Sequence, residues 1–440
     1  MLAEDLGFDE NKKIFIATYN HEGQRINTIK GAPESVFGMS KSDKAMDQKF
    51  DEYIRDGLRT IAFAQKLENE EFYNITGLIS FDDKVRQGVR EAVLKCSSAG
   101  VRVIMITGDH AGTARRVAES VGIAAGSVVT GDDIIGMNPE KLRAALKVSS
   151  VFARISPEQK LMIVNALRAN GEVVGVTGDG INDAPALKSA DIGISMGLSG
   201  TDVAKEASDM ILTNDSFISI VDAILEGRRI HDNLSKCVKY YLSCKVGLVI
   251  SFLVPVLLGI PLPFSPIQII ILEIFMDLAA STSFVAEKEE SDLLSRKPRD
   301  PKENFMNGHM MAGILGGSLT LAAIVLAVYL YSWFNTGSTG TAQTYAFTAW
   351  MFGHVALAFN MRTENIPLSE SGVFSSRPFN AWMAGVIIFL VVSINLPMLN
   401  IYLKLSPVGI VPLVIIALIS VAATSWIEVR KHLSKSWKKI

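Results

Sequence analysis

Six apolar stretches occupy most of residues 231–440 of this 440-residue chain. A run of about twenty mainly apolar residues is long enough to cross a lipid bilayer as one helix. We therefore expect residues 231–440 to form a transmembrane domain with six helices that lies in the lipid bilayer. Their expected positions are about 237–259, 266–285, 310–333, 344–361, 380–400 and 407–427.

Basic residues indicate which side of the membrane each connecting segment faces. Lysine and arginine gather between the second and third stretches, between the fourth and fifth, and in the tail, whereas the other connections hold only Lys404. We expect the basic segments and the soluble first half to be cytoplasmic, in a multi-pass protein of the cell membrane. The basic residues are Lys288, Arg296, Lys297, Arg299, Lys302, Arg362, Arg377, Arg430, Lys431, Lys435, Lys438 and Lys439.

Charge and cysteine content exclude several classes of function. The net charge is −2, so no overall basic field favours binding to nucleic acid. The three cysteines, Cys96, Cys237 and Cys244, have no spacing typical of a disulfide framework or a zinc site.

An apolar run, Val173 to Val176, ends in the loop Thr177-Gly-Asp-Gly-Ile-Asn-Asp183. Such a run predicts a buried parallel strand, and ligands bind at the carboxyl ends of parallel strands. Asp179 and Asp183 are close enough across a tight loop to share one divalent cation, and Mg²⁺ commonly takes one or two carboxylates. The alternative is that both aspartates only shape a turn and cap a helix.

The longer string TGDGINDAPALKSADIGISMG, residues 177–197, resembles the hinge region of the phosphorylation domain of P-type ATPases. These are the ion-pumping branch of the haloacid dehalogenase superfamily. The resemblance implies a haloacid dehalogenase-like doubly wound parallel sheet, here incomplete, and phosphoryl transfer through an aspartyl-phosphate, in which positioning and charge neutralisation supply most of the catalysis. It also implies that Asp179 and Asp183 hold Mg²⁺ and that Asn182 hydrogen-bonds the phosphoryl group.

Two further elements agree with this resemblance. The predicted strand 101–106 leads into Thr107-Gly108-Asp109, a phosphate cradle formed by a hydroxyl and the amides at a helix start. Lys160 lies in the first turn of a helix that Ser156-Pro157 introduces. A lysine there is usually a solvated surface charge, but the resemblance implies that it faces the phosphoaspartate.

The first 75 residues are similar to part of the family's nucleotide-binding domain. A predicted hairpin, with strands at 13–19 and 24–29, precedes Lys30-Gly31-Ala-Pro-Glu, where the family's lysine lines the ATP pocket. The resemblance also implies ATP contacts for Arg59, in Gly-Leu-Arg-Thr, and for Asp83 and Arg86, which match a D-P-P-R motif without its prolines. The family's adenine-stacking phenylalanine cannot be identified from the sequence.

The resemblance divides the chain into three parts: residues 1–75, a partial nucleotide-binding domain; 76–230, a partial phosphorylation domain; and 231–440, the transmembrane domain. The family's acceptor aspartate lies in the string D-K-T-G-T, which occurs nowhere in this sequence. The chain thus resembles the C-terminal half of a pump, with the N-terminal half as an implied partner. Two alternatives are an inactive membrane subunit or regulator and a membrane-tethered phosphatase.

Ionisable groups inside membrane spans are costly and therefore candidates for function. Lys245 lies in the first span, and Glu273 and Asp277 lie in the second at positions i and i+4, on one face. The alternative is a structural ion pair between Lys245 and one of these carboxylates. In the resembling pumps these spans carry the cation site, and the string L-E-I-F-M-D-L there places Asp277 on a family carboxylate.

One departure concerns the transported ion. The family's calcium pumps have asparagine and glutamate where this sequence has Lys245 and Leu248. A fixed ammonium group near Asp277 lowers the attraction for a second divalent ion. The sequence therefore favours a proton or a monovalent cation as substrate, with calcium as the other possibility.

Overall fold

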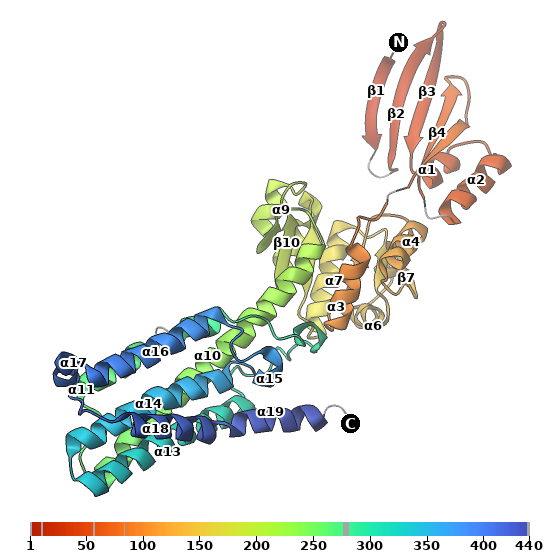
Figure 1. Ribbon diagram of the computed structural model, residues 1–440. Helices are drawn as coiled ribbons and strands as arrows, with labels where there is room; N and C mark the ends of the chain where they lie inside the picture. Colours follow the sequence, from red (N-terminus) through yellow and green to blue (C-terminus); the bar gives the residue numbers. More distant parts are fainter. Residues whose placement is uncertain (1, 10–11, 56–57, 83, 276–280, 438–440) are drawn as a thin grey trace. The chain divides into compact units, whose positions relative to one another are not determined.

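The computed structural model describes residues 2–9, 12–55, 58–82, 84–275 and 281–437 (Figure 1). The chain forms two compact units, Met1–Asp222 and Ala223–Ile440. The first unit contains all the strands, and the second consists of helices and their connections.

The first part of unit one is a five-stranded antiparallel sheet in the order β1-β2-β3-β4-β5. The predicted hairpin forms between β2 and β3, where His21 pairs with Gln24 and the turn residues Glu22 and Gly23 have positive φ angles of 49° and 80°. Helices α1 (Pro33–Gly38) and α2 (Lys44–Arg55) contact the sheet. The strands are β1 (Leu2–Asp9), β2 (Ile14–His21), β3 (Gln24–Gly31), β4 (Arg59–Leu67) and β5 (Asn74–Phe81).

The second part of unit one alternates strands and helices, as the sequence predicts. All its strand pairs are parallel, in two three-stranded sheets with the orders β6-β8-β7 and β11-β10-β9. The strands are β6 (Met105–Ile106), β7 (Val128–Thr130), β8 (Val151–Ala153), β9 (Gly175–Gly178), β10 (Ile192–Met196) and β11 (Met210–Leu212). The helices are α3 (Val89–Ser98), α4 (Ala111–Val121), α5 (Gly131–Ile135), α6 (Pro139–Val148), α7 (Pro157–Ala169), η1 (Ile181–Asp183), α8 (Ala184–Ser189) and α9 (Asp202–Ala207).

The doubly wound sheet, which we expect to be incomplete, is divided into two sheets. Among the described residues no strand joins β6 to β9, so each of these strands leaves one edge unpaired. The predicted strand 101–106 is reduced to Met105–Ile106, because the residues before Met105 have no neighbouring strand with which to form a ladder. One core nevertheless connects both sheets, since Phe152 of β8, Ile163 of α7 and Val176 of β9 belong to the same buried cluster.

Unit two is a bundle of long helices with an aromatic core that includes Trp350, Phe347 and Tyr329. Glycine positions let these helices approach closely: a Cβ on Gly317 would lie 2.8 Å from the Ser243 hydroxyl. The helices are α10 (Ile218–Leu257), α11 (Pro266–Glu273), α12 (Ser281–Val285), α13 (Gly308–Thr336), α14 (Thr339–Met361), α15 (Leu368–Ser371), α16 (Arg377–Asn395), α17 (Pro397–Leu403), α18 (Ile410–Thr424) and α19 (Trp426–Trp437), with the short η3 (Leu293–Ser295).

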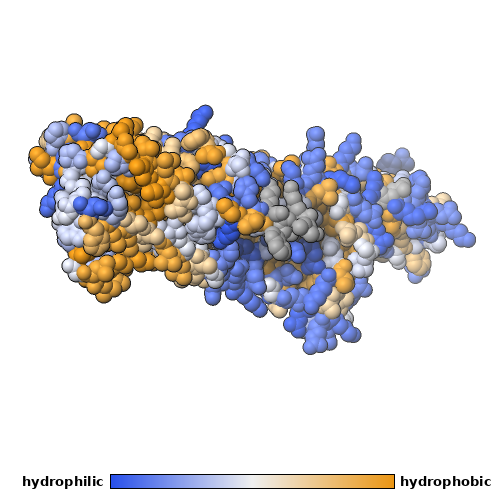
Figure 2. All heavy atoms as spheres, turned by 60° about the horizontal axis from the view of Figure 1, so that its bottom comes forward, coloured by the Kyte–Doolittle hydropathy of each residue, from blue (hydrophilic) through white to orange (hydrophobic). Residues whose placement is uncertain are grey.

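Four helical segments of the described chain are long and apolar enough to cross a membrane: Ile218–Leu257, Gly308–Thr336, Arg377–Asn395 and Ile410–Ser434. The apolar surface in Figure 2 gathers over the helices of this unit. The other two predicted spans are not among these four segments. The span predicted at 344–361 lies within α14, which the bundle largely buries. The span predicted at 266–285 falls on α11, α12 and residues 276–280, and these last are outside the described residues.

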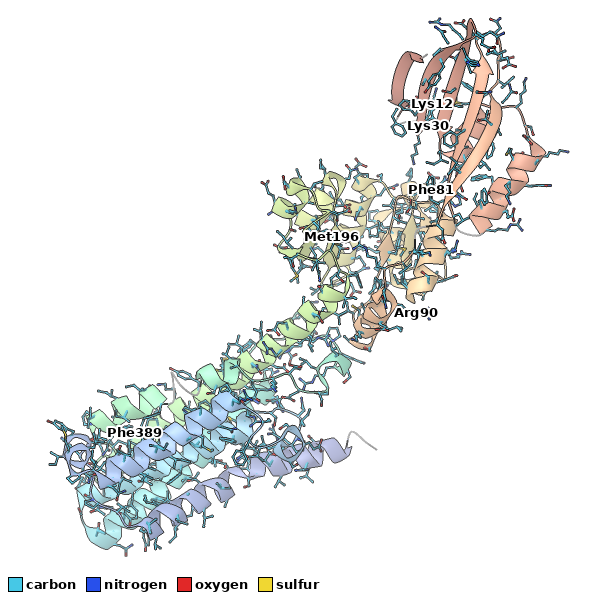
Figure 3. The ribbon with its side chains drawn as sticks, turned by 45° about the horizontal axis from the view of Figure 1, so that its top comes forward. Lys12, Lys30, Phe81, Arg90, Met196 and Phe389 are labelled. Carbon is cyan, nitrogen blue, oxygen red and sulfur yellow. The ribbon has the colours of Figure 1, made fainter. Side chains whose placement is uncertain are left out.

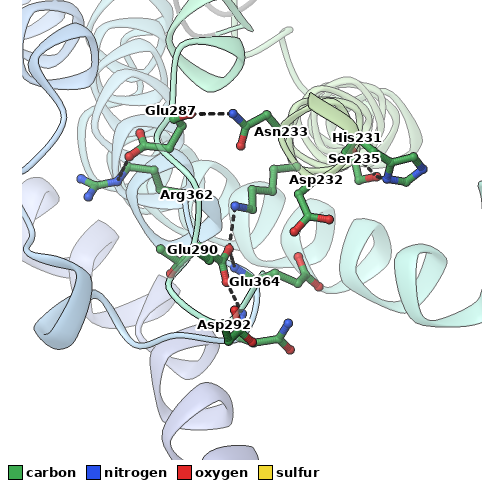
Figure 4. Close-up of polar contacts among 12 residues, drawn as sticks. His231, Asp232, Asn233, Ser235, Glu287, Glu290, Asp292, Arg362 and Glu364 are labelled. Atoms are coloured by element: carbon green, nitrogen blue, oxygen red, sulfur yellow. Dashed lines mark hydrogen bonds and ion pairs between the residues drawn. The ribbon is translucent and has the colours of Figure 1, made fainter. Parts of the chain in front are cut away.

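A buried network of charges joins two connecting segments to α10 (Figure 4). Glu290, in the connection between α12 and α13, accepts a hydrogen bond from Lys236 of α10 at 2.6 Å, and both side chains are under 5% exposed. Glu290 also pairs with Arg296 at 2.9 Å and accepts the backbone N–H of Glu364 at 2.9 Å. A second pair, Arg362 and Glu287 at 3.3 Å, lies beside it.

Candidate functional site

Helix α7 brings Lys160 to the loop that follows β9. The Ser156 side chain accepts the N–H of Gln159, the Gln159 side chain accepts the N–H of Ser156, and Pro157 begins the helix, which together fix its first turn. From that turn the Lys160 ammonium group donates to Asp183 Oδ1 at 2.7 Å, and both side chains are less than one-fifth exposed. Lys160 is therefore a partner of the loop and not a solvated surface charge.

The Asp183 carboxylate is held from two directions. Its Oδ1 atom faces Lys160, and its Oδ2 atom accepts the backbone N–H groups of Asp179 at 3.2 Å and Gly180 at 3.3 Å. Burial raises the pKa of Asp183, but the hydrogen bond and charge of Lys160, together with these amides, outweigh burial and lower it. The turn requires glycine at Gly178, because a Cβ there would lie 2.5 Å from the Cβ of Asp183.

Asp179 is exposed, and its backbone carbonyl accepts the N–H of Thr201 at 2.9 Å. The described residues contain no cluster of three or more metal-binding side chains, and the two carboxylates near this loop are those of Asp179 and Asp183. Mg²⁺ commonly takes one or two carboxylates and completes its octahedron with water and phosphate oxygens. The donor set therefore fits Mg²⁺. Asp179 is the freer ligand, since Asp183 already binds Lys160.

Thr107 lies at the carboxyl end of β6, next to the start of α7. Its carbonyl accepts the N–H of Ile155 at 3.1 Å, and the carbonyl of Asp109 accepts the N–H of Arg154 at 3.0 Å. The Thr107 hydroxyl donates to Asp109 Oδ2 at 3.1 Å and accepts the N–H of Asp109 at the same distance. A Cβ on Gly108 would meet no atom within 4 Å, so the space beside this backbone is open.

A cavity of about 250 Å³ opens beside Asp179. Its wall includes Arg86, Met196 and Asp215. Arg86 donates to the carbonyl of Asp215 at 2.5 Å, and the Asp215 carboxylate accepts the N–H groups of Leu198 and Ser199 at 2.9 and 2.7 Å. The bond from Leu198 is the main reason why the pKa of Asp215 lies below its usual value.

The antiparallel sheet carries a row of side chains across its strands, on the face that holds Lys30 (Figure 3). Phe8 pairs with Phe15, Phe15 with Lys30, and Lys30 with Phe63, so all four point to one face. The Lys30 ammonium group lies 4.9 Å from the centre of the Phe15 ring, and Phe8 is 60% exposed. Gly31 permits the close strand approach, since a Cβ there would lie 2.3 Å from the carbonyl of Lys13.

Other predicted site residues have different positions. Asn182 is exposed in η1. Arg86 lines the cavity that contains Asp179, whereas Lys30 lies on the antiparallel sheet. The backbone of Arg59 begins β4, but its side chain is outside the described part of the structure, as is all of Asp83.

In unit two, Lys245 of α10 forms an ion pair with Glu273 of α11 and lies 5.0 Å from the centre of the Tyr241 ring. This is the ion pair that the sequence offers as the structural alternative. Pro255 lies inside α10, which continues to Leu257, and its carbonyl accepts the N–H of Ile260 at 3.1 Å. Asp277 lies outside the described residues.

Two family models match the chain. Residues 13–191 match haloacid dehalogenase-like hydrolase, and residues 261–433 match Cation transporting ATPase, C-terminus. The first match contains the loop of Asp179 and Asp183, and the second contains five of the six predicted spans.

Curated relatives extend these matches. The chain is 33% identical to Calcium-transporting ATPase 1 of Bacillus cereus over 85% of its own length and 46% of the relative's. It is 34% identical to a Calcium-transporting ATPase of Bacillus subtilis, over 88% of the chain and 46% of the relative. It is 36% identical to Probable cation-transporting ATPase F of Mycobacterium tuberculosis, over 76% of the chain and 38% of the relative. The chain thus spans less than half the length of these relatives.

Proposed function

This chain belongs to the P-type ATPases, and on that premise we propose that it supplies the phosphate-site hinge, part of the nucleotide-binding surface and the main transport helices of an ATP-driven cation pump. The observation that carries this proposal is the ion pair of Lys160 and Asp183 beside Asp179. The pair fixes charged groups at one strand end, where a phosphoryl group would need them.

In the proposed reaction each residue of this chain has one task. The Lys160 ammonium group neutralises charge on the phosphoryl oxygens while Asp183 holds it in place. The Thr107 hydroxyl and the open backbone at Gly108 donate to the same oxygens, and Asn182 adds an amide donor. Asp179 holds the Mg²⁺ ion, which supplies further positive charge when bound.

The divided sheet supports a specific place for the acceptor aspartate. A parallel strand between β6 and β9 would pair with both unpaired edges and end beside Thr107 and Asp179. We place a D-K-T-G-T segment there, supplied by polypeptide outside this sequence.

For ATP, the proposed surface is the open face of the antiparallel sheet. Phe8 would stack on the adenine ring, and Lys30 would reach the nucleotide next to it. Phe8 would then be the adenine-stacking phenylalanine that cannot be identified from the sequence.

The test is formation of an acyl phosphate. The chain is co-expressed with the N-terminal half of the Bacillus subtilis relative, and membranes are incubated with γ-³²P-ATP and Mg²⁺. We expect hydroxylamine-sensitive label on the N-terminal half, at least tenfold reduced by Lys160→Ala in this chain. Label on this chain when it is expressed alone would contradict the proposal, because the acceptor would then lie within it.

The transported cation has two candidates. The names of the relatives favour calcium. The ion pair of Lys245 with Glu273 favours a proton or a monovalent cation, because it neutralises one carboxylate of a divalent site. Uptake of ⁴⁵Ca²⁺ by vesicles that contain the assembled pump decides between them. Tight calcium binding that survives Lys245→Ala and is lost with Asp277→Asn would refute the role given to Lys245.

A further inference from the structure

A shallow groove lies in unit two where α13 and α14 meet α10 and α19. Its lining includes Lys239, Asn360, Glu364, Trp426, Arg430 and Lys431. The groove has about 310 Å³ of empty space, open solvent included, but only about 20 Å³ of it can hold the centre of a water-sized atom. It therefore encloses about one such atom, for example a single oxygen of a larger group that stays outside.

The charges of the groove do not cancel. The Lys239 ammonium group pairs with Glu364, and Lys431, only 2% exposed, pairs with Glu428 at 2.5 Å and donates to the carbonyl of Asn360 at 2.7 Å. Arg430 is half-buried in the lining, and its charge, after that of Lys239, helps to lower the pKa of Glu364, although the described part of the chain shows no salt bridge between Arg430 and a carboxylate. Three cations, Lys239, Arg430 and Lys431, thus lie near two carboxylates, Glu364 of the lining and Glu428 beside it, and the cation in excess favours an anion.

The flanking surface changes from apolar to basic at this point. Exposed Leu418 and Val421 precede the groove on α18, and half-buried Arg430 and exposed His432 follow on α19. Trp426 lies at the transition, 37% exposed, with its indole N–H donating to the Thr320 hydroxyl at 3.0 Å. Tryptophan at such a transition is typical of the membrane–water interface, where lipid headgroups lie.

We propose that this groove binds the phosphate of an anionic phospholipid headgroup. A guanidinium group presents two parallel N–H donors to phosphate oxygens, so Arg430 is the main contact. Lys239 and Lys431, although paired with Glu364 and Glu428, line the same groove behind it. Exposed Val429 and Leu433 on α19, 55% and 59% exposed, provide apolar surface for an acyl chain. Basic pockets between membrane helices on the cytoplasmic side are suited to such headgroups.

The experiment measures lipid binding to the full chain, purified in detergent, by native mass spectrometry. The probes are phosphatidylglycerol and phosphatidylcholine, which have the same acyl chains but differ in net charge. We expect retained phosphatidylglycerol adducts, weaker phosphatidylcholine adducts, and an affinity for phosphatidylglycerol about tenfold lower in Arg430→Gln. Lys302→Gln is the matched control, because Lys302 is an exposed cation outside the groove lining.

Two results would overturn the proposal. Equal losses in Arg430→Gln and Lys302→Gln would mean general surface attraction and no specific groove. Displacement of the lipid by millimolar inorganic phosphate would mean a free-anion site. Arg430→Lys guards against a folding defect: it keeps the charge without the paired donors, so we expect an affinity between those of the native chain and Arg430→Gln.

Discussion

At the scale of single residues, Lys160 controls the electrostatic state of Asp183. Because the pKa of Asp183 is lowered in the folded chain, its ionised form stabilises the loop above its ordinary value of 3.8, and that contribution disappears as the pH falls through the lowered value. Without Lys160, burial is opposed only by the backbone N–H groups of Gly180 and Asp179, so the pKa of Asp183 is lowered less. The loss of stability on acidification should then begin at a higher pH.

We predict that Lys160→Met lowers the opening free energy of the loop 177–187 by about 2 kcal/mol at pH 7, because a half-buried carboxylate loses its charged partner. Hydrogen exchange of peptides from this loop, followed by mass spectrometry, measures the effect. The double variant Lys160→Met/Asp183→Asn should recover part of the loss. Equal protection in all three proteins from pH 4 to 7 would show that the pair is unimportant for the loop.

Phe8 allows a second prediction at this scale. We expect Phe8→Ala to weaken ATP binding about tenfold or more, since base stacking on an aromatic ring contributes roughly 1–3 kcal/mol. Phe72→Ala is the matched control, because Phe72 is 47% exposed and lies outside the row of Phe8, Phe15, Lys30 and Phe63. Equilibrium dialysis with labelled ATP gives both affinities. A similar decrease in the two variants would argue against stacking on Phe8.

At the scale of elements, Glu290 joins two connecting segments to α10. Burial raises the pKa of Glu290, but Lys236, the N–H of Glu364 and Arg296 outweigh burial and lower it, so the carboxylate is charged. Removal of this carboxylate leaves the Lys236 ammonium group buried without its partner. We predict that Glu290→Gln destabilises unit two by about 3 kcal/mol. Thermal unfolding in detergent should show a lower midpoint, whereas the exposed neighbour Glu289 can be changed to glutamine without effect. An unchanged midpoint in Glu290→Gln would refute the prediction.

The sequence predicts elements best where their determinants are local. The loop from Thr177 to Asp183 and the capped start of α7 lie in continuous motifs, so both were predictable. The neighbours of Lys30 were not, because the row from Phe8 to Phe63 depends on the register of four strands. The sequence left two interpretations of Lys245 open, a functional group of the transport site or a member of a structural ion pair. Spacing alone does not reveal which groups on two different helices meet. The sequence predicted an incomplete sheet but not the place where it divides, because a strand edge depends on a partner distant in sequence.

At the scale of the whole molecule, we predict that residues 1–75 are cleaved first by a nonspecific protease. Strand β1 is an edge strand with irregular pairing to β2 between Leu2 and Glu4 and between Asp5 and Gly7, and edge strands open more easily than central ones. Limited proteolysis of the full chain in detergent, with mass spectrometry of the fragments, locates the first cuts. Uniform resistance across the first 222 residues would contradict this prediction.

The unpaired edges of β6 and β9 also determine the order and rate at which the complete sheet assembles. Each three-stranded half can form around its own helices, but a strand that enters between them must find two edges at once. If that strand belongs to another polypeptide, completion of the sheet is a bimolecular step whose half-time shortens as the partner becomes more concentrated. Before that encounter the two edges are templates for any extended chain, so synthesis of the partners in the same place and time protects this chain from aggregation.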